Sequence, residues 1–320
     1  MRLKRFYNLI VSNNKSVLFL ILLYVAAQFL FIPEYTWLEL VGVAALHIGV
    51  ALSLLYINQL FIIIKTKTFL LASFYLLFVI TQPSFYGEIY PALSALCILF
   101  ASFILFFTYQ NPQSQWAYFI SGLILGIGSL WFPPFLFFIP LLWRGGYRFQ
   151  SLNTRSLIAT LLGAGFVCLG IFTYSVYKND LSLFPSFFSS WESLLSIQIH
   201  LSLQEILSIG ILLLLFIIAS INLYLPGRGE RIKTLHYLSY FFILGLISMI
   251  GYFIQSQWNE SWLAIFFLGA SFMLTHLFSK HYSRLGLFSL LFIILILIST
   301  FILTLFFPEM NNTNVFVFTN

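Results

Sequence analysis

Long apolar runs alternate with short polar segments along the whole chain. Most of these runs reach or approach the roughly 20 residues that an α-helix needs to cross about 30 Å of hydrocarbon. We therefore predict membrane-spanning helices at about residues 17–33, 40–64, 68–82, 90–109, 116–131, 133–143, 155–177, 204–225, 234–255, 261–279 and 284–307.

Composition supports the same fold class. Hydrophobic residues make up 61% of the chain and charged residues 8%, whereas soluble domains are about 45–50% apolar and about 25% charged. These values exclude a soluble enzyme, a disordered chain and a disulfide-stapled secreted domain. The prediction is an all-α, polytopic transmembrane helical bundle that forms a single integral membrane domain over residues 1–320. Cys97 and Cys168 both lie in apolar runs, so neither a disulfide framework nor a cysteine metal knuckle is expected.

Lys and Arg residues indicate the topology, because positive residues collect in cytoplasmic loops. With the N-terminus inside, every Lys and Arg except Lys178 falls on the cytoplasmic side, and every acidic residue except Glu230 falls outside. The net charge of +6 therefore indicates cytoplasmic loops and no nucleic-acid partner.

The segment 116–143 is the doubtful part of this topology, because Trp131-Phe132-Pro133-Pro134 interrupts it. A single crossing here would place Arg144 and the basic residues after it outside. Two short segments that meet at the proline pair, as a hairpin or re-entrant loop, keep those residues inside, and proline disfavours a continuous helix. We therefore predict eleven membrane segments, N-in and C-out, with 178–203 as the longest extracytoplasmic loop and 308–320 as a short extracytoplasmic tail.

The outer face carries the candidate catalytic and binding residues. Glu34 and Glu39 flank the first outer loop and are the candidate catalytic pair. Carboxylates beside Tyr and Trp serve as general bases, metal ligands or sugar platforms, but they equally solvate loop ends beside an interfacial aromatic belt. The candidate substrate-binding residues on this side are Glu88, Trp131, Trp191 and His200.

On the inner face, Arg144, Arg148 and Arg155 form a basic loop that matches the oxygens of a lipid phosphate or pyrophosphate. Their role in fixing the topology explains them equally well. The sequence assigns no cofactor.

Few polar residues lie inside the predicted spans, and no Asp, Glu, Lys or Arg lies near the middle of one. We interpret His47, Gln28 and Asn58 mainly as hydrogen-bonding groups between neighbouring helices.

Glycines recur on one side of two predicted spans. Gly122-x-x-x-Gly126-x-Gly128 favours a close approach of another helix to the fifth segment, and Gly163, Gly165 and Gly170 do the same for the seventh.

Three stretches carry a family resemblance: Asn58-Gln59-Leu60 with Lys65-x-Lys67, Gly122 to Pro134, and Arg155 with Gly163-Ala164-Gly165. Over about residues 1–180 the chain resembles a family of uncharacterised polytopic inner-membrane proteins of Bacteroidota-type bacteria. More loosely, the glycine-rich helix, aromatic-proline break and basic loop resemble the GT-C glycosyltransferases, which take sugars from polyprenyl-phosphate carriers at the outer face. Those enzymes carry an acidic pair in a long first outer loop, whereas the loop with Glu34 and Glu39 has about six residues here.

The leading functional hypothesis is a multi-pass inner-membrane protein of the cell envelope that acts on a lipid-linked or amphiphilic substrate at the outer leaflet. In the enzymatic form that the GT-C resemblance implies, Glu34 or Glu39 acts as base or metal ligand and the loop 178–203 covers a polyprenyl-phosphate-linked or other lipid substrate. The alternatives are a transporter or flippase for an apolar substrate, and a structural subunit of a membrane complex. The partner common to all three hypotheses is the lipid bilayer.

The topology is testable with a reporter fused after Asn320. Because the tail is predicted outside, an enzyme that is active only in an extracytoplasmic compartment should be active in this fusion. A reporter that is active in the cytoplasm would contradict the topology.

Overall fold

The computed structural model describes residues 14–29, 36–64, 69–188, 191, 198–224, 231–280 and 314–319, together with the single positions Leu295 and Ser299. In chain order, the α-helices in these residues are α2 (Asn14–Phe29), α3 (Trp37–Phe61), α4 (Leu70–Ile80), α5 (Ile89–Phe106), α6 (Gln115–Gly128), α7 (Ile139–Arg148), α8 (Thr154–Tyr177), α9 (Leu183–Phe187), α10 (Leu203–Tyr224), α11 (Ile232–Ile254) and α12 (Asn259–Lys280). The 3₁₀ turns are η1 (Pro83–Phe85), η2 (Pro133–Phe138) and η4 (Ser256–Trp258), and the strands are β1 (Gln198–Ser202) and β2 (Asn314–Thr319).

The predicted helical class is confirmed. Among the described residues, five helices are long and apolar enough to cross a membrane: Trp37–Phe61, Ile89–Phe106, Thr154–Tyr177, Ile232–Ile254 and Asn259–Ser279. Shorter apolar helices cover Leu18–Gln28, Leu70–Ile80, Gln115–Gly128 and Ser208–Ile221. The predicted span at 284–307 lies outside the described residues, apart from Leu295 and Ser299.

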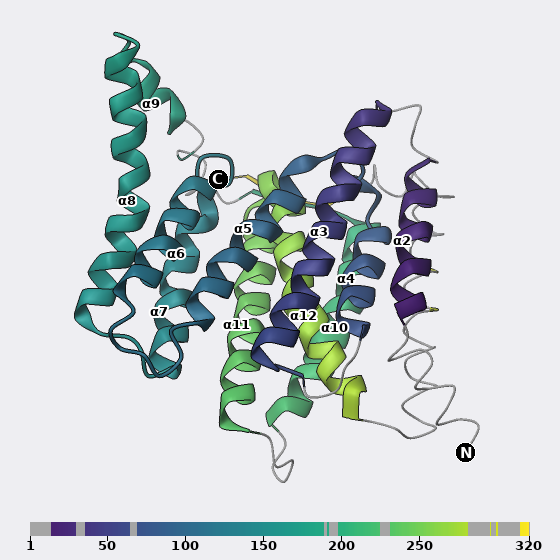
Figure 1. The fold of residues 1–320 in the computed structure, drawn as a ribbon. Helices are drawn as coiled ribbons and strands as arrows, with labels where there is room; N and C mark the ends of the chain where they lie inside the picture. The colour runs from purple at the N-terminus through teal and green to yellow at the C-terminus, as the bar shows by residue number, and fades with distance from the viewer. Residues whose placement is uncertain are drawn as a thin grey trace.

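The long helices run up and down between two ends of one bundle (Figure 1). α2 lies at one edge and α8 at the other, and α8 extends past the ends of its neighbours. We call the end where α3 begins and α9 lies the upper end, and the opposite end, where α11 begins, the lower end.

α12 forms the centre of the bundle. Every residue from Ser261 to His276 is buried, and the helix packs on α4, α5, α10 and α11. Gly269 makes one of the close contacts, because a Cβ placed there would lie 2.7 Å from the carbonyl oxygen of Phe241 on α11. A helix that is apolar on all sides is expected to be surrounded by others in this way.

The helical structure is interrupted at the predicted proline pair. α6 ends at Gly128, Phe132 is extended (φ −131°, ψ 80°), and the two prolines open the 3₁₀ turn η2. An extended residue before proline is expected, because the α region clashes with the proline ring. Phe132 is fully buried, and its ring lies 5.1 Å from that of Trp262 on α12, so the break is held in the core.

The two predicted glycine patterns pack against each other. A Cβ at Gly122 of α6 would lie 2.1 Å from the carbonyl oxygen of Thr160 on α8, and one at Gly163 of α8 would lie 2.1 Å from that of Phe119. Gly126 faces Ala164 in the same contact. The helices therefore meet backbone to backbone, as small-xxx-small patterns allow.

The other predicted glycines do not take part in this contact. Gly128 lies against the ring of Phe135, whereas Gly165 and Gly170 have open space where a Cβ would be.

A two-stranded antiparallel sheet adds to the helices. β1 pairs with β2 from Gln198↔Thr319 to Ser202↔Asn314, with an irregularity between Leu201 and Ser202. The sheet joins the end of the predicted 178–203 loop to the predicted tail 308–320, which the apolar pattern of the chain did not reveal.

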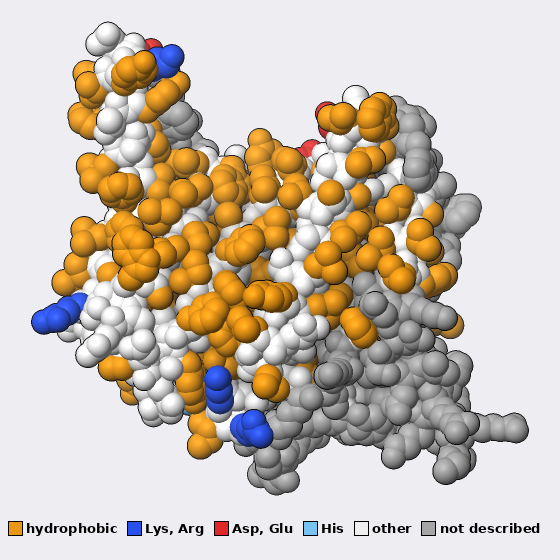
Figure 2. All heavy atoms as spheres, viewed as in Figure 1, with side chains coloured by type: hydrophobic (Ala, Val, Ile, Leu, Met, Phe, Trp, Pro, Cys, Tyr) orange, Lys and Arg blue, Asp and Glu red, His pale blue; other side chains and the backbone are white. Residues whose placement is uncertain are grey.

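Charged residues divide between the two ends of the bundle. Within the described ranges, Lys and Arg occupy the lower ends of helices except for Lys178 after α8, and the Asp and Glu positions all belong to the upper ends. Figure 2 shows the same division, with apolar side chains covering the surface between. Exposed aromatic residues also mark both ends, with Trp37 and Tyr177 at the upper end and Trp116 and Tyr147 at the lower, as in an interfacial belt.

Gly122→Ala tests the contact between α6 and α8. Since the new methyl group cannot fit beside the Thr160 carbonyl, the helices must separate, and we expect unfolding to become easier by about 1–3 kcal/mol. Thermal unfolding in detergent measures this. Gly170→Ala is the matched control on α8, where the methyl group meets open space and stability should hold or rise slightly. Equal melting temperatures for the two variants would show that the contact does not constrain the fold.

Candidate functional site

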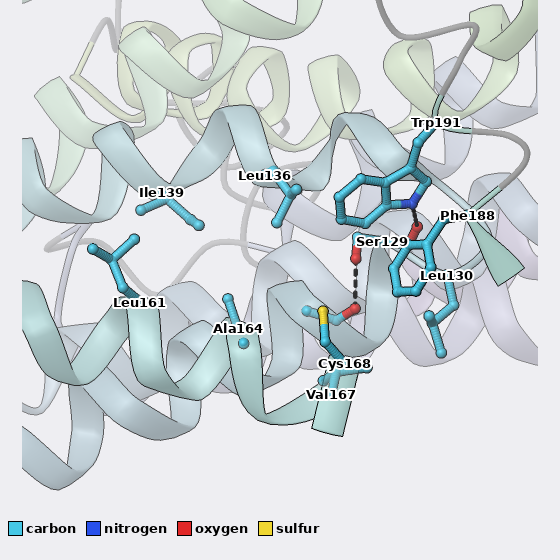
Figure 3. Close-up of a pocket in the computed structure, with 12 residues that line it drawn as sticks. Ser129, Leu130, Leu136, Ile139, Leu161, Ala164, Val167, Cys168, Phe188 and Trp191 are labelled. Atoms are coloured by element: carbon cyan, nitrogen blue, oxygen red, sulfur yellow. Dashed lines mark hydrogen bonds between the residues drawn. The ribbon is translucent and has the colours of Figure 1, made fainter. Parts of the chain in front are cut away.

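An apolar cavity of about 240 Å³ lies where α6, η2, α7 and α8 meet (Figure 3). Its lining residues are Gly126, Ser129, Leu130, Leu136, Ile139, Leu161, Ala164, Gly165, Val167, Cys168, Phe188 and Trp191. It adjoins the C-terminal end of α6, so it belongs to the upper half of the bundle.

The polar groups around this cavity are bonded to each other. The hydroxyl of Ser129 donates to the carbonyl oxygen of Gly126 (2.6 Å), and the indole Nε1 of Trp191 donates to the carbonyl oxygen of Ser129 (3.3 Å). Figure 3 shows these bonds at one edge, with carbon side chains facing the remaining space. The cavity therefore offers van der Waals contact to a guest and little hydrogen bonding.

Aromatic rings connect Trp191 to the upper part of α8. Phe172 contacts Phe184 of α9 (5.8 Å between ring centroids), Phe184 contacts Phe188 (5.2 Å), and Phe188 contacts Trp191 (4.9 Å). This row of rings positions Phe188 and Trp191 over the cavity. Among the described candidate residues from the sequence, Trp191 is the one that lines the cavity.

Trp131 lies close to the cavity without lining it. Its ring packs against Phe135 of η2 (6.2 Å), and its Nε1 is buried without a hydrogen-bond partner. The structure thus brings Trp131 and Trp191 to the same region, because Trp191 bonds to Ser129 two residues before Trp131.

The two candidate carboxylates that the structure describes, Glu39 and Glu88, lie apart from this cavity. Glu39 is exposed and forms a capping box at the start of α3, where its Oε2 accepts from the backbone N–H (3.0 Å) and hydroxyl (2.7 Å) of Thr36. Glu88 is exposed just before α5. Glu34 lies outside the described residues, and His200 is placed only through its backbone in β1.

The candidate arginines are exposed at the lower end of the bundle. Arg144 and Arg148 belong to the last turns of α7, and Arg155 to the first turn of α8. They lie at the opposite end from the candidate carboxylates, so the two groups do not form one site.

A buried polar cluster surrounds His47, near the middle of α3. The His47 Nδ1 lies 2.9 Å from the hydroxyl of Tyr75 on α4, and its ring stacks on Phe85 (5.8 Å, 6°). Tyr24 of α2 approaches edge-on (6.1 Å). The Nε2 atom of His47 is buried without a hydrogen-bond partner.

Tyr86, in the connection between α4 and α5, also belongs to the cluster, because its ring lies 6.0 Å from that of Tyr24. Its hydroxyl donates to the carbonyl oxygen of Ile80 (2.9 Å), and burial raises the pKa of this phenol above its usual value. The group therefore stays protonated and keeps its donor role.

His47 bonds to a neighbouring helix as its sequence position indicates, whereas the described bonds of Gln28 and Asn58 are local. The Gln28 amide donates to Tyr24 one turn earlier in the same helix (3.0 Å), and Asn58 accepts from the backbone N–H of Ile64 (2.8 Å), which follows the end of α3. The bonds that the structure describes for these two residues are therefore local, and their interhelical role stays a prediction.

No protein-family model, curated protein or solved structure matches the chain.

Tyr75→Phe tests the hydrogen bond to His47. Because the change leaves a second imidazole nitrogen buried and unpaired, we expect the free energy of unfolding in detergent to fall by about 1–2 kcal/mol. The exposed Tyr90 offers a control, since Tyr90→Phe removes the same hydroxyl from the surface. In the double variant His47→Phe/Tyr75→Phe the loss should be smaller than the sum of the two single losses, and additive losses would contradict an energetic role for the bond.

Proposed function

We propose that this protein holds the apolar chain of an amphiphile in the outer-leaflet half of a cell inner membrane, as a multi-pass protein of the cell envelope. The observation that carries this proposal is the apolar cavity between α6 and α8, beneath Phe188 and Trp191. Its volume of about 240 Å³ is below the roughly 300–1,000 Å³ of pockets that enclose a whole drug-sized ligand. One hydrocarbon chain, with its headgroup outside, suits this space.

The N-in, C-out topology with about eleven segments forms part of the proposal. Its support is the division of charges between the two ends, because the lower end carries the described Lys and Arg residues apart from Lys178. The pairing of β1 with β2 also supports it, since the outer loop and the tail were expected on one side. In this orientation the cavity faces the outer leaflet.

The physics of the membrane interior limits what the cavity selects. A chain that enters from the bilayer leaves one hydrocarbon environment for another, so it gains no hydrophobic free energy. Shape and packing decide which chains fit, and the headgroup must supply further specificity. In this topology Glu34, Glu39 and Glu88 belong to the same end as the cavity. The GT-C resemblance implies that these residues serve a transfer reaction, and that role stays a prediction.

Photocrosslinking tests the cavity. We expect a phospholipid with a diazirine near the middle of one acyl chain, reconstituted with the protein, to label Leu136 and Ile139, identified by mass spectrometry. Ile139 is only 7% exposed, so a lipid that merely coats the surface labels it poorly. The labelling of Phe100, which is exposed on α5, gives the level expected from contact with bulk lipid.

Two glycines of α8 provide a matched pair of variants. Both have open space at the Cβ position, but Gly165 lines the cavity and Gly170 does not. Gly165→Leu should fill the cavity and abolish the labelling of Ile139, while Gly170→Leu should leave it unchanged. Labelling that persists in Gly165→Leu, or that is absent from the unsubstituted protein, would refute the proposal.

A further inference from the structure

Cationic side chains gather at the lower end of the bundle, where α7 ends and α11 begins. Arg144 and Arg148 come from α7, Arg231 and Lys233 from the start of α11, and all four are exposed. The two helices pack on each other, so residues far apart in the sequence meet here. Figure 2 shows Lys and Arg side chains close together at this lower edge.

Aromatic rings fix the position of one of these cations. The Lys233 ammonium lies over the ring of Tyr109 (5.1 Å to the centroid) and near that of Tyr237 (5.7 Å). Such cation–π contacts hold an ammonium in place without neutralising its charge. Lys233 therefore presents a positioned positive charge.

His236 lies between this lysine and α7. The centroid of its ring lies 6.3 Å from that of Tyr109, and the residue follows Lys233 by one helical turn. The positive charge of Arg148 acts electrostatically on this ring. The Nδ1 atom of His236 is buried and has no hydrogen-bond partner. Once a rotation of the ring exposes this atom, an acceptor from outside the chain would satisfy it in the tautomer that carries a proton on Nδ1.

The described part of the chain offers this cluster no carboxylate. The Asp and Glu residues that the structure describes belong to the upper ends of helices, namely Glu39, Glu88, Asp180, Glu205 and Glu260. Within the described residues the cluster is therefore cationic, which favours an anion from outside.

We propose that Arg148, Lys233 and His236 bind the phosphate of an anionic phospholipid headgroup. A lipid is favoured as the source of this phosphate because apolar side chains flank the cluster: Tyr147 is 75% exposed and Ile232 69%. These side chains suit the acyl region just below a headgroup, while the arginine fork and the ammonium suit phosphate oxygens. The site is independent of the upper cavity, so either proposal can fail without the other.

The experiment compares charge-neutralised variants in nanodiscs of phosphatidylcholine with a minor fraction of phosphatidylglycerol. After extraction, native mass spectrometry gives the ratio of phosphatidylglycerol to phosphatidylcholine that stays bound. The unsubstituted protein should retain phosphatidylglycerol selectively. In Arg148→Gln/Lys233→Gln this selectivity should fall by about thirtyfold, the effect of two cationic groups near an anionic headgroup.

Lys178→Gln is the matched control for the single variant Lys233→Gln, because it removes the same charge from an exposed position at the upper end of α8. It should keep the selectivity, as should Arg148→Lys/Lys233→Arg, which preserves the charges. Equal losses in Lys178→Gln and Lys233→Gln, or no selectivity in the unsubstituted protein, would overturn the proposal. Stabilisation of the detergent-solubilised protein by inorganic phosphate, with no preference for phosphatidylglycerol, would also overturn it, because the ligand would then be a free anion.

Discussion

The backbone contact between α6 and α8 is the constraint on which the upper half of the structure depends. Gly122 and Gly163 each approach a carbonyl group of the other helix so closely that no Cβ fits. The helices then diverge above this contact, and the cavity occupies the space between α8 and the broken chain of η2. The same glycines thus fix the separation of the helices and the position of the space beside them.

The second constraint is the packing around α12. Phe132, at the break, lies against Trp262, whose indole Nε1 donates to Gln255 (3.2 Å). Because the break is anchored to the central helix while α8 is held through glycines, the two walls of the cavity belong to different parts of the bundle. One wall is fixed to the core, and the other is a peripheral helix whose surface is largely exposed.

The sequence predicts the features that follow from local chemistry. Apolar runs locate the helices, the proline pair locates the break, and the glycine spacing identifies the close contact, since each depends on residues near one another in the chain. The sequence does not predict that Tyr75 meets His47 or that Lys233 lies over the ring of Tyr109. Those pairs depend on which helices become neighbours, and in lipid many arrangements bury similar apolar faces. Of the candidate site residues, Trp191 was found to line the cavity, while Cys168 and Ile139 carry no signal that separates them from ordinary apolar residues.

The position of α8 ties the cavity to the thickness of the bilayer. This helix packs chiefly on α6 and α9, and its upper turns rise beyond the other helices. A thin membrane would leave apolar side chains such as Leu169 and Phe172 outside the hydrocarbon, and tilting is a usual response to such mismatch. A tilt of α8 about the glycine contact would move Val167 and Cys168 relative to η2. The volume of the cavity would then vary with the lipids around the protein, without any rearrangement of the helices near α12.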